Sequence, residues 1–326
     1  PEALQEYTEL LKEEILFWKF CQYKFYEQWK FLKQYANTRG IQIIGDIPLY
    51  MAMDSADVWA DRKLFLLEED GSQQHVAGSP PDNFSEEGQK WGNPVYDYSY
   101  MEEHQFDWWR HRIEKNAALY DVIRIDHFLG VVRYYTIPFQ EKDCCNGKWN
   151  KGPGKKLTDV MEESAGDCRI IADNAGSAIA GSRKLLARIG WPGSKILMFA
   201  FDGNTGNENL PHNFEENNIV VYTGTHDNDT VVGYFRDKTE YELAYLYEYL
   251  NIKDRGEIVD GLIRCAYASI ADIAIIQMQD FLKLGNEARM NQPATVGYNW
   301  RWRLNKEQLE AGRRAWIRNL AAVYRR

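Results

Sequence analysis

The sequence lacks the excess of basic residues that phosphate-rich partners require. Its 39 lysines and arginines are outnumbered by 48 aspartates and glutamates, which gives a formal net charge of −9. Nucleic acids and anionic membrane surfaces are bound through clustered Lys and Arg. No apolar run approaches the roughly 20 residues that span a membrane, and residues 1–6 have neither the basic nor the apolar region of a signal peptide. We therefore expect no nucleic-acid and no membrane partner.

Cysteine pairs and nucleotide-binding motifs are also missing. The five cysteines are odd in number and contain no CxxC pair, which predicts free thiols in a reducing cytosol and a cytoplasmic protein. No GxGxxG or P-loop pattern follows a strand-like segment, so nucleotide binding has no support. The run 226–229, His-Asp-Asn-Asp, suggests a metal site, but its spacing matches no zinc or EF-hand pattern.

Short apolar segments alternate with helical patterns along the chain. Such strands are buried on both faces of a parallel sheet, which predicts an α/β fold, either a barrel or a doubly wound sheet. The segment 48–98 is polar, rich in Gly and Pro, and too long for a simple connection, so we interpret it as a functional loop or small subdomain. The segment 139–156 is expected to be a loop. The expected strands are 41–46, 121–126, 169–173, 195–201, 218–222 and, as strand or helix, 270–276.

Four of these segments end in, or run into, an acid: Asp46, Asp126, Asp173 and Asp227. In a (β/α)8 barrel the carboxyl ends of all strands face one pocket, so these residues would converge there. The alternative is that each aspartate caps the helix that follows its strand. Four such positions in one chain favour a shared site.

A cluster of carboxyls suits the cleavage of a glycosidic bond. That reaction needs a proton donor for the leaving oxygen and a carboxylate on the opposite face of the sugar ring, and crowded carboxyls raise each other's pKa. Arg124 lies two residues before Asp126, on the same side of a strand, and is expected to keep Asp126 ionised and oriented. His127 and His226 are expected either to bond sugar hydroxyls or to be core histidines. The 11 Trp, 20 Tyr and 14 Phe fit a carbohydrate site as well as a core.

Several motifs resemble those of glycoside hydrolase family seventy-seven, the amylomaltases and disproportionating enzymes. The segment Arg124-Ile125-Asp126-His127-Phe128 is similar to the one that holds the nucleophile of that family. The segment 223–230, Thr-Gly-Thr-His-Asp-Asn-Asp-Thr, resembles the one with the aspartate that stabilises the transition state. Further segments similar to the family are 45–50, 54–59, 77–82, 88–94, 289–291 and 299–303.

The resemblance implies a fold and an activity. The fold is a (β/α)8 TIM-type barrel, and the activity is that of a retaining 4-α-glucanotransferase, which transfers α-1,4-glucan segments to an acceptor glucan or glucose. Its partners would be maltooligosaccharides and fragments of starch or glycogen, with no metal or organic cofactor. By position, Asp126 would be the nucleophile, Asp173 the acid/base and Asp227 the stabilising carboxylate. The implied substrate-binding residues are Arg124, His127, His226, Asp46, Asp82, Trp91, Phe199 and Asn291.

The sequence departs from the family pattern at the acid/base. The family has Glu where this chain has Asp173, and the loss of one methylene withdraws the carboxyl by roughly 1.5 Å. Misplacement by ~1 Å can cost ~100-fold in rate. Asn83 replaces a Tyr of the substrate loop, and Leu129 replaces an Arg beside the nucleophile. The alternative function is therefore a catalytically impaired or inactive α-glucan-binding homologue or fragment.

The match to the family also predicts the domain organisation. The chain begins in the helix before the third barrel strand of the family, so we expect about six of eight barrel strands and an incomplete ring. Residues 1–326 would form a single partial barrel, and residues 48–98 an insertion after the first strand present.

Overall fold

Six parallel strands organise the molecule, in two sheets of three. The computed structural model describes residues 2–82, 84–174 and 180–326. The strand orders are β1-β4-β7 and β10-β9-β8, and every pairing within these two sheets is parallel. The parallel strands are β1 (Ile44–Ile47), β4 (Val122–Ile125), β7 (Arg169–Ala172), β8 (Gly193–Ile196), β9 (Ile219–Tyr222) and β10 (Ile273–Ile275).

The two parallel sheets adjoin at β7 and β8. The Ala172 amide donates to the Pro192 carbonyl over 2.9 Å, and the Ser194 hydroxyl donates to the Ala172 carbonyl over 3.1 Å. The strands therefore follow one another in chain order from β1 to β10. Within the described residues, the outer edges of β1 and β10 have no strand partner.

All six expected parallel strands are present, with shifted bounds. The expected strand 195–201 ends early, because β8 stops at Ile196 and residues 197–199 turn into a 3-10 helix. The ambiguous segment 270–276 contains β10. Strands β4 and β9 are buried at every position, which explains why their sequences are apolar without alternation.

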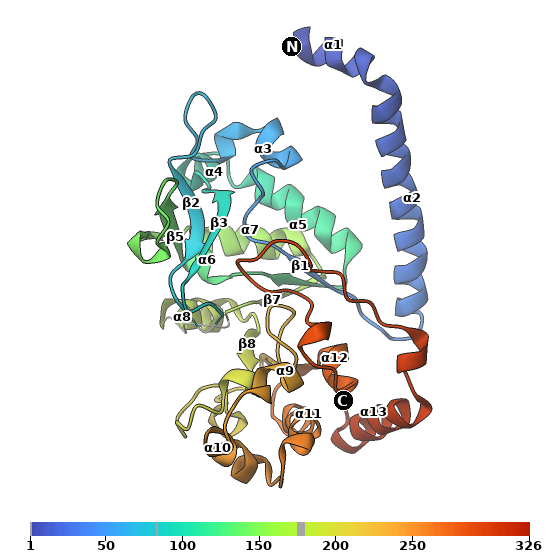
Figure 1. Cartoon of the computed structure of the whole chain (residues 1–326). Coiled ribbons are helices and arrows are strands. Elements are labelled where there is room, and N and C mark those ends of the chain that lie inside the picture. The colour runs from blue at the N-terminus through green and yellow to red at the C-terminus, as the bar shows by residue number, and fades with distance from the viewer. Residues whose placement is uncertain (1, 83, 175–179) are drawn as a thin grey trace.

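A separate antiparallel sheet stands beside the parallel strands (Figure 1). Its order is β3-β2-β5-β6, so two strands come from the segment 48–98 and two from residues 133–151. The expected loop 139–156 was wrong in part, because it contains β6, whose polar sequence Lys-Trp-Asn-Lys gave no apolar signal. The strands of this sheet are β2 (His75–Ser79), β3 (Gln89–Pro94), β5 (Arg133–Pro138) and β6 (Lys148–Lys151).

Helices fill the connections and cover the strands. Residue burial divides the apolar interior into two main clusters, one around Trp109 and Ile123 and the other around Val220 and Leu262. The α-helices are α1 (Glu2–Leu10), α2 (Lys12–Asn37), α3 (Ala56–Ala60), α4 (Tyr98–Glu103), α5 (Asp107–Leu119), α6 (Leu129–Val132), α7 (Lys155–Ala165), α8 (Ala180–Ile189), α9 (Val231–Arg236), α10 (Glu240–Leu250), α11 (Ile258–Ala268), α12 (Met278–Phe281) and α13 (Ala311–Tyr324). The 3-10 helices are η1 (Arg62–Leu64), η2 (Cys144–Asn146), η3 (Leu197–Phe199), η4 (Pro211–Asn213), η5 (Arg255–Glu257), η6 (Asn286–Ala288) and η7 (Lys306–Gln308).

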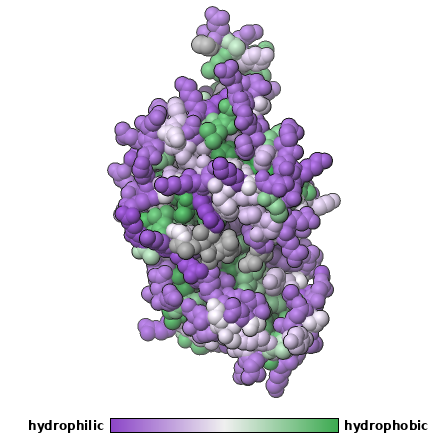
Figure 2. Space-filling model, turned by 90° about the vertical axis from the view of Figure 1, so that its left-hand side faces the viewer, coloured by the Kyte–Doolittle hydropathy of each residue, from purple (hydrophilic) through white to green (hydrophobic). Residues whose placement is uncertain are grey.

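The body of the molecule has a mostly hydrophilic face, and helix α2 packs against the body over only part of its length. Figure 2 shows a face of the body that is covered mostly by hydrophilic side chains. Helix α2 extends along one side (Figure 1), and Ala36 is its one buried residue. The helix is anchored near its C-terminal end, where the Trp29 indole donates to the Leu119 carbonyl over 2.9 Å. Among the described helices, none combines the length and the apolar character that crossing a membrane requires.

We expect the N-terminal half of α2 to open far more readily than the strands. Helical stability in proteins comes mostly from packing of an apolar face, and residues 12–28 bury no side chain. Their backbone amides should exchange with deuterium at least about tenfold faster than those of β4, since exchange follows local opening. Hydrogen–deuterium exchange read by mass spectrometry checks this. Equal protection of both segments would contradict it and would mean that α2 is packed in solution.

Candidate active site

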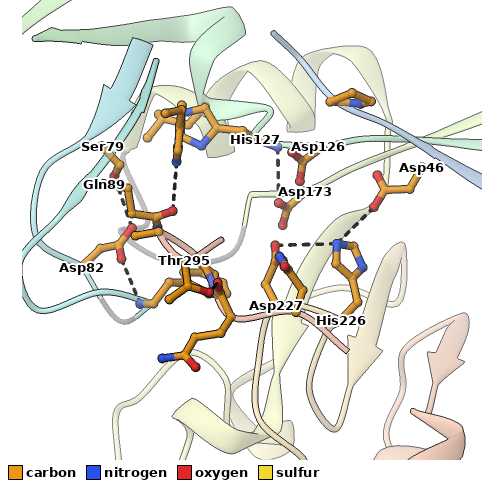
Figure 3. A pocket seen from close by; sticks show the side chains of 18 of the residues that line it. Asp46, Ser79, Asp82, Gln89, Asp126, His127, Asp173, His226, Asp227 and Thr295 are labelled. Atoms are coloured by element: carbon orange, nitrogen blue, oxygen red, sulfur yellow. Dashed lines mark hydrogen bonds and ion pairs between the residues drawn. The ribbon is translucent and has the colours of Figure 1, made fainter. Parts of the chain in front are cut away.

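Four aspartates converge at the carboxyl ends of the parallel strands (Figure 3). Asp46 lies within β1, one residue before its end, whereas Asp126 and Asp173 directly follow β4 and β7. Asp227 lies in the loop after β9. Because β1, β4 and β7 pair in parallel register, with Asp46 opposite Arg124 and Arg124 opposite Ile171, their ends meet at one edge. The structure thus brings together residues that are up to 181 positions apart in sequence (227 − 46).

Arg124 forms ion pairs with three of these carboxylates. Its Nη1 lies 2.5 Å from Asp46 Oδ2 and 3.2 Å from Asp126 Oδ1, and its Nη2 lies 2.9 Å from Asp173 Oδ2. The Arg124 side chain is only 7% exposed. A buried guanidinium presents its donors in a fixed fork, so it holds the three carboxyls at set positions. Arg124 was predicted to bind substrate, but its side chain is buried and it is not among the residues that line the cavity.

The pKa of Asp126 is higher than the sequence led us to expect. Arg124 was expected to keep this carboxyl ionised, yet burial raises the pKa of Asp126 to about 8, with the neighbouring Asp173 adding to the rise and Arg124 opposing it. Burial also raises the pKa of Asp46, against the lowering effect of Arg124. One buried cation does not offset desolvation and several carboxyls, so protonation at this edge is shared.

A cavity of about 580 Å³ opens over the carboxyls. Nine of the predicted site residues line it: Asp46, Asp82, Trp91, Asp126, His127, Asp173, His226, Asp227 and Asn291. Phe199 lies in a neighbouring cavity, where its ring packs edge-on against Phe84, which does line the central one. The lining residues that sequence reasoning did not select are Pro48, Ser79, Phe84, Gln89, Leu129, Asn174, Ser182, Gln292, Pro293, Ala294, Thr295 and Trp300.

His127 sits in an unusual backbone conformation beside the carboxyls. Its φ of +47° falls in the left-handed region, which is uncommon for a residue with a side chain. Its amide donates to Asp173 Oδ2 over 3.3 Å, and its ring meets the edge of Trp91, with centroids 4.8 Å apart. Burial lowers the pKa of His127, so the imidazole is neutral at pH 7. Within the described part of the chain, its Nε2 has no hydrogen-bond partner.

His226 and Asp227 form the opposite side of the cavity. His226 Nε2 lies 3.7 Å from Asp46 Oδ2 and 3.6 Å from Asp227 Oδ2, and its ring lies 5.0 Å from that of Trp300. The Asn291 side chain, predicted to line a subsite, donates to Asp227 Oδ1 over 2.6 Å. Asn291 therefore orients Asp227 in addition to lining the cavity.

The segments 77–82 and 88–94, which the sequence showed to be similar to the family, supply a third side of the cavity. Asp82 Oδ1 accepts hydrogen bonds from the amides of Phe84 and Ser85 over 2.9 and 3.1 Å, so this carboxylate stabilises its own turn. The Trp91 indole donates to Gln89 over 2.9 Å. Asn83, where the sequence departs from the family, lies outside the described residues. Among the residues that the structure describes, no group of three or more His, Cys, Asp or Glu side chains is placed to hold a metal ion.

We expect the substitution Asp126→Asn to stabilise the protein at pH 8. The pKa of Asp126 rises from an ordinary value of 3.8 to about 8 on folding, so the folded form holds the extra proton between these values and the unfolding free energy falls as pH rises. Asparagine removes this penalty. The melting temperature should rise by a few degrees at pH 8, given roughly 2–4 °C per kcal/mol in larger domains. The gain should shrink at pH 5 and vanish below about pH 4. Thermal unfolding measured across this range checks it, and a gain that does not depend on pH would contradict it.

Comparisons with known proteins identify the family to which the chain is similar. A family model described as 4-alpha-glucanotransferase matches residues 1–309. The 4-alpha-glucanotransferase of Clostridium butyricum is 48% identical over 306 residues, which cover 93% of this chain and 62% of that protein.

Two solved structures resemble the whole fold. The amylomaltase from Streptococcus agalactiae in complex with acarbose superposes with a TM-score of 0.94 at 41% identity, over 100% of this chain and 66% of that one. The amylomaltase from Corynebacterium glutamicum, at 18% identity, shares the fold with a TM-score of 0.73 over 87% of this chain and 46% of that one. The chain spans less than two thirds of the length of these relatives. It belongs to glycoside hydrolase family 77, the 4-alpha-glucanotransferase family.

Proposed function

We propose that this chain carries the catalytic centre of a retaining 4-α-glucanotransferase that acts on α-1,4-glucans. The observation that carries the proposal is the meeting of Asp126, Asp173 and Asp227 at one cavity, two of them at the ends of adjacent parallel strands. Family membership supports the same activity. Crowded, partly buried carboxyls are the arrangement that separates the protonation states of an acid and a nucleophile.

In the proposed mechanism, the proton that the coupled carboxyls share lies on Asp173 in the reacting complex, which leaves Asp126 ionised. The Asp126 carboxylate attacks the anomeric carbon and the bond to the leaving glucan breaks. Asp173 gives its proton to the leaving oxygen, and a glycosyl ester on Asp126 results. An acceptor hydroxyl then attacks the same carbon, loses its proton to Asp173 and releases Asp126. Asp227, oriented by Asn291, faces the positive charge that develops on the ring. Two inversions retain the α configuration.

Substrate binding follows from the polarity of the cavity walls. The neutral His127 imidazole, with the Trp91 ring edge against it, can bond a sugar hydroxyl while an adjacent sugar packs on apolar surface. His226 can bond a hydroxyl from the other side. The Streptococcus agalactiae relative was solved with acarbose, which supports an oligosaccharide ligand for this cavity. We propose maltooligosaccharides and fragments of starch or glycogen as substrates.

We also infer that the six parallel strands are part of an eight-stranded barrel. The sequential order of the strands and the outer edges of β1 and β10, which lack a strand partner within the described residues, support this inference. Residues 1–326 would then form a single partial barrel, with 48–98 as an inserted substrate-loop subdomain. The five free cysteines fit a cytoplasmic protein.

Incubation with maltotriose tests the proposed activity. Transfer should yield glucose together with maltopentaose and longer oligosaccharides, because a second glucan takes the glycosyl group from Asp126. Chromatography of the products checks this, and Asp126→Asn should remove the activity by at least about 10⁴-fold. Glucose and maltose without any longer product would mean hydrolysis and would refute the transfer.

A second candidate function is glucan binding with little turnover, and Asp173 is the observation that favours it. Its Oδ2 forms an ion pair with Arg124 and accepts a hydrogen bond from the His127 amide, and its side chain is 14% exposed. A short carboxyl held this way is poorly placed to reach a leaving oxygen. The two candidate functions make different predictions for a longer side chain at position 173. It should restore glucan transfer in an impaired enzyme and should have no such effect in a binding protein.

We expect Asp173→Glu to raise the transfer rate from maltotriose by about 10- to 100-fold. The added methylene extends the carboxyl by about the distance whose loss lowers a rate by this factor. With α-glucosyl fluoride as donor, fluoride leaves without a proton, so the variant should gain far less. Initial rates with both donors check this, and the exposed Asp159→Glu on α7 serves as the matched control. Binding of maltotriose without turnover in both proteins would favour the second function.

A further inference from the structure

A fully buried carboxylate outside the catalytic cavity joins the two ends of the loop that carries His226 and Asp227. Asp280, on α12, accepts a hydrogen bond from the Thr223 hydroxyl over 2.7 Å through Oδ2. Its Oδ1 accepts one from the Val231 amide over 2.8 Å. Thr223 directly follows β9 and Val231 begins α9. One side chain therefore fixes where the loop leaves the sheet and where it enters the next helix.

We propose that Asp280 is a positioning residue that sets the place of Asp227 in the cavity; this rests on the proposed glucanotransferase function. Asp280 does not line the cavity and acts only through the loop 223–231. The loop is short, so a shift at either end moves the residues between them. Asp227 and His226 lie at its centre.

The interior of the loop is itself tightly bonded, which lets it move as one unit. The Asn228 side chain accepts hydrogen bonds from the Thr225 amide and hydroxyl over 2.8 and 3.0 Å. The Thr230 hydroxyl caps α9 by accepting a bond from the Gly233 amide over 3.0 Å. A displacement of either end of the loop therefore displaces Asp227 as well, because the hydrogen bonds within the loop restrict local rearrangement.

Other residues of the segment 277–291 contact the middle of the same loop. The Arg289 guanidinium donates to the Asp227 carbonyl over 2.8 Å, and Asn286 donates to Asp229 Oδ2 over 2.7 Å. Asn286 is exposed, whereas Thr223, Val231 and Asp280 are fully buried. A buried bond to a charged group is the costly one to lose, since the remaining partner stays unsatisfied. Asp280 is thus a stronger support for the loop than the exposed Asn286.

The position of Asp280 is costly for stability, which argues for a role in function. Within the described residues no Lys, Arg or His forms an ion pair with it, unlike Asp260, which pairs with Lys283 and Arg313. Burial raises the pKa of Asp280 to about 6, while its bonds to Thr223 and Val231 lower it and Asp229 raises it. Buried carboxylates with shifted pKa values concentrate at functional sites.

The test compares Thr223→Val, Thr223→Ser and Asp280→Asn with the wild-type chain. Thr223→Val removes one donor to Asp280, keeps the volume of the side chain and leaves the Val231 bond in place, so it is the milder change beside Asp280→Asn. It should lower kcat for transfer from maltotriose by about 10- to 100-fold, as expected for a ~1 Å displacement of a catalytic group, and change KM by less than about threefold. Thr223→Ser restores the hydroxyl and should recover the rate. Asp260→Asn, a carboxylate of the same region that does not contact the loop, serves as the control.

Hydrogen–deuterium exchange of the peptide that covers 223–231 gives a readout that does not depend on activity. Exchange there should be faster in Thr223→Val and Asp280→Asn, and unchanged in Thr223→Ser and Asp260→Asn. Wild-type kcat and wild-type exchange in Thr223→Val would overturn the proposal. If the wild-type chain itself transfers nothing, the proposed function fails, and the exchange result alone then decides whether Asp280 holds the loop.

Discussion

The ion pairs of one buried guanidinium determine how this site is built. Arg124 can reach Asp46, Asp126 and Asp173 only because β1, β4 and β7 pair in parallel and in register. Any slip of one residue along a strand turns the side chain to the opposite face and breaks these contacts. The fold and the site thus depend on the same register. Burial of the apolar strands fixes their register. This register places the carboxyls of Asp46, Asp126 and Asp173 within reach of Arg124.

The same arrangement sets the electrostatics and the cost of the site. A single cation faces several carboxyls in a space with little water, so negative charge is in excess and the pKa of Asp126 rises. Asp280 repeats this pattern outside the cavity, as a buried carboxylate that is held by hydrogen bonds from Thr223 and Val231. Both positions destabilise the folded state at neutral pH. Natural proteins accept such penalties where function requires a particular orientation, and in our proposals Asp126 is the nucleophile and Asp280 positions Asp227.

The parallel strands and their terminal acids could be predicted from sequence, because strands buried on both faces are apolar throughout. Strand β6 was missed because Lys148–Lys151 is half exposed and polar. The run 292–295 reaches the cavity from irregular backbone, which leaves no periodic signal. Trp300 lies in the segment 299–303, which resembles the family, but the resemblance alone did not identify it as a cavity residue. The sequence led us to expect a low pKa for Asp126, whereas the structure raises it. The sequence shows that Arg124 is two residues away, but it does not show the burial of Asp126 or its proximity to Asp173. Asp280 gave no signal, because its partners are 57 and 49 residues away in sequence.

The position of Asp173 limits how the chain can compensate for a short side chain. Its amide donates to the Ile125 carbonyl over 2.9 Å, and its carbonyl accepts from the Phe128 amide over 2.8 Å. These bonds tie the backbone of Asp173 to the end of β4, so the strand cannot advance to return the lost methylene without breaking them. The missing reach has to come from rotation of the side chain away from Arg124 or from a closer approach of the sugar. Rotation would separate Asp173 from the guanidinium that also orders Asp126 and Asp46. In the mechanism that we propose, the contact between Asp173 and Arg124 would therefore compete with the movement that proton transfer requires.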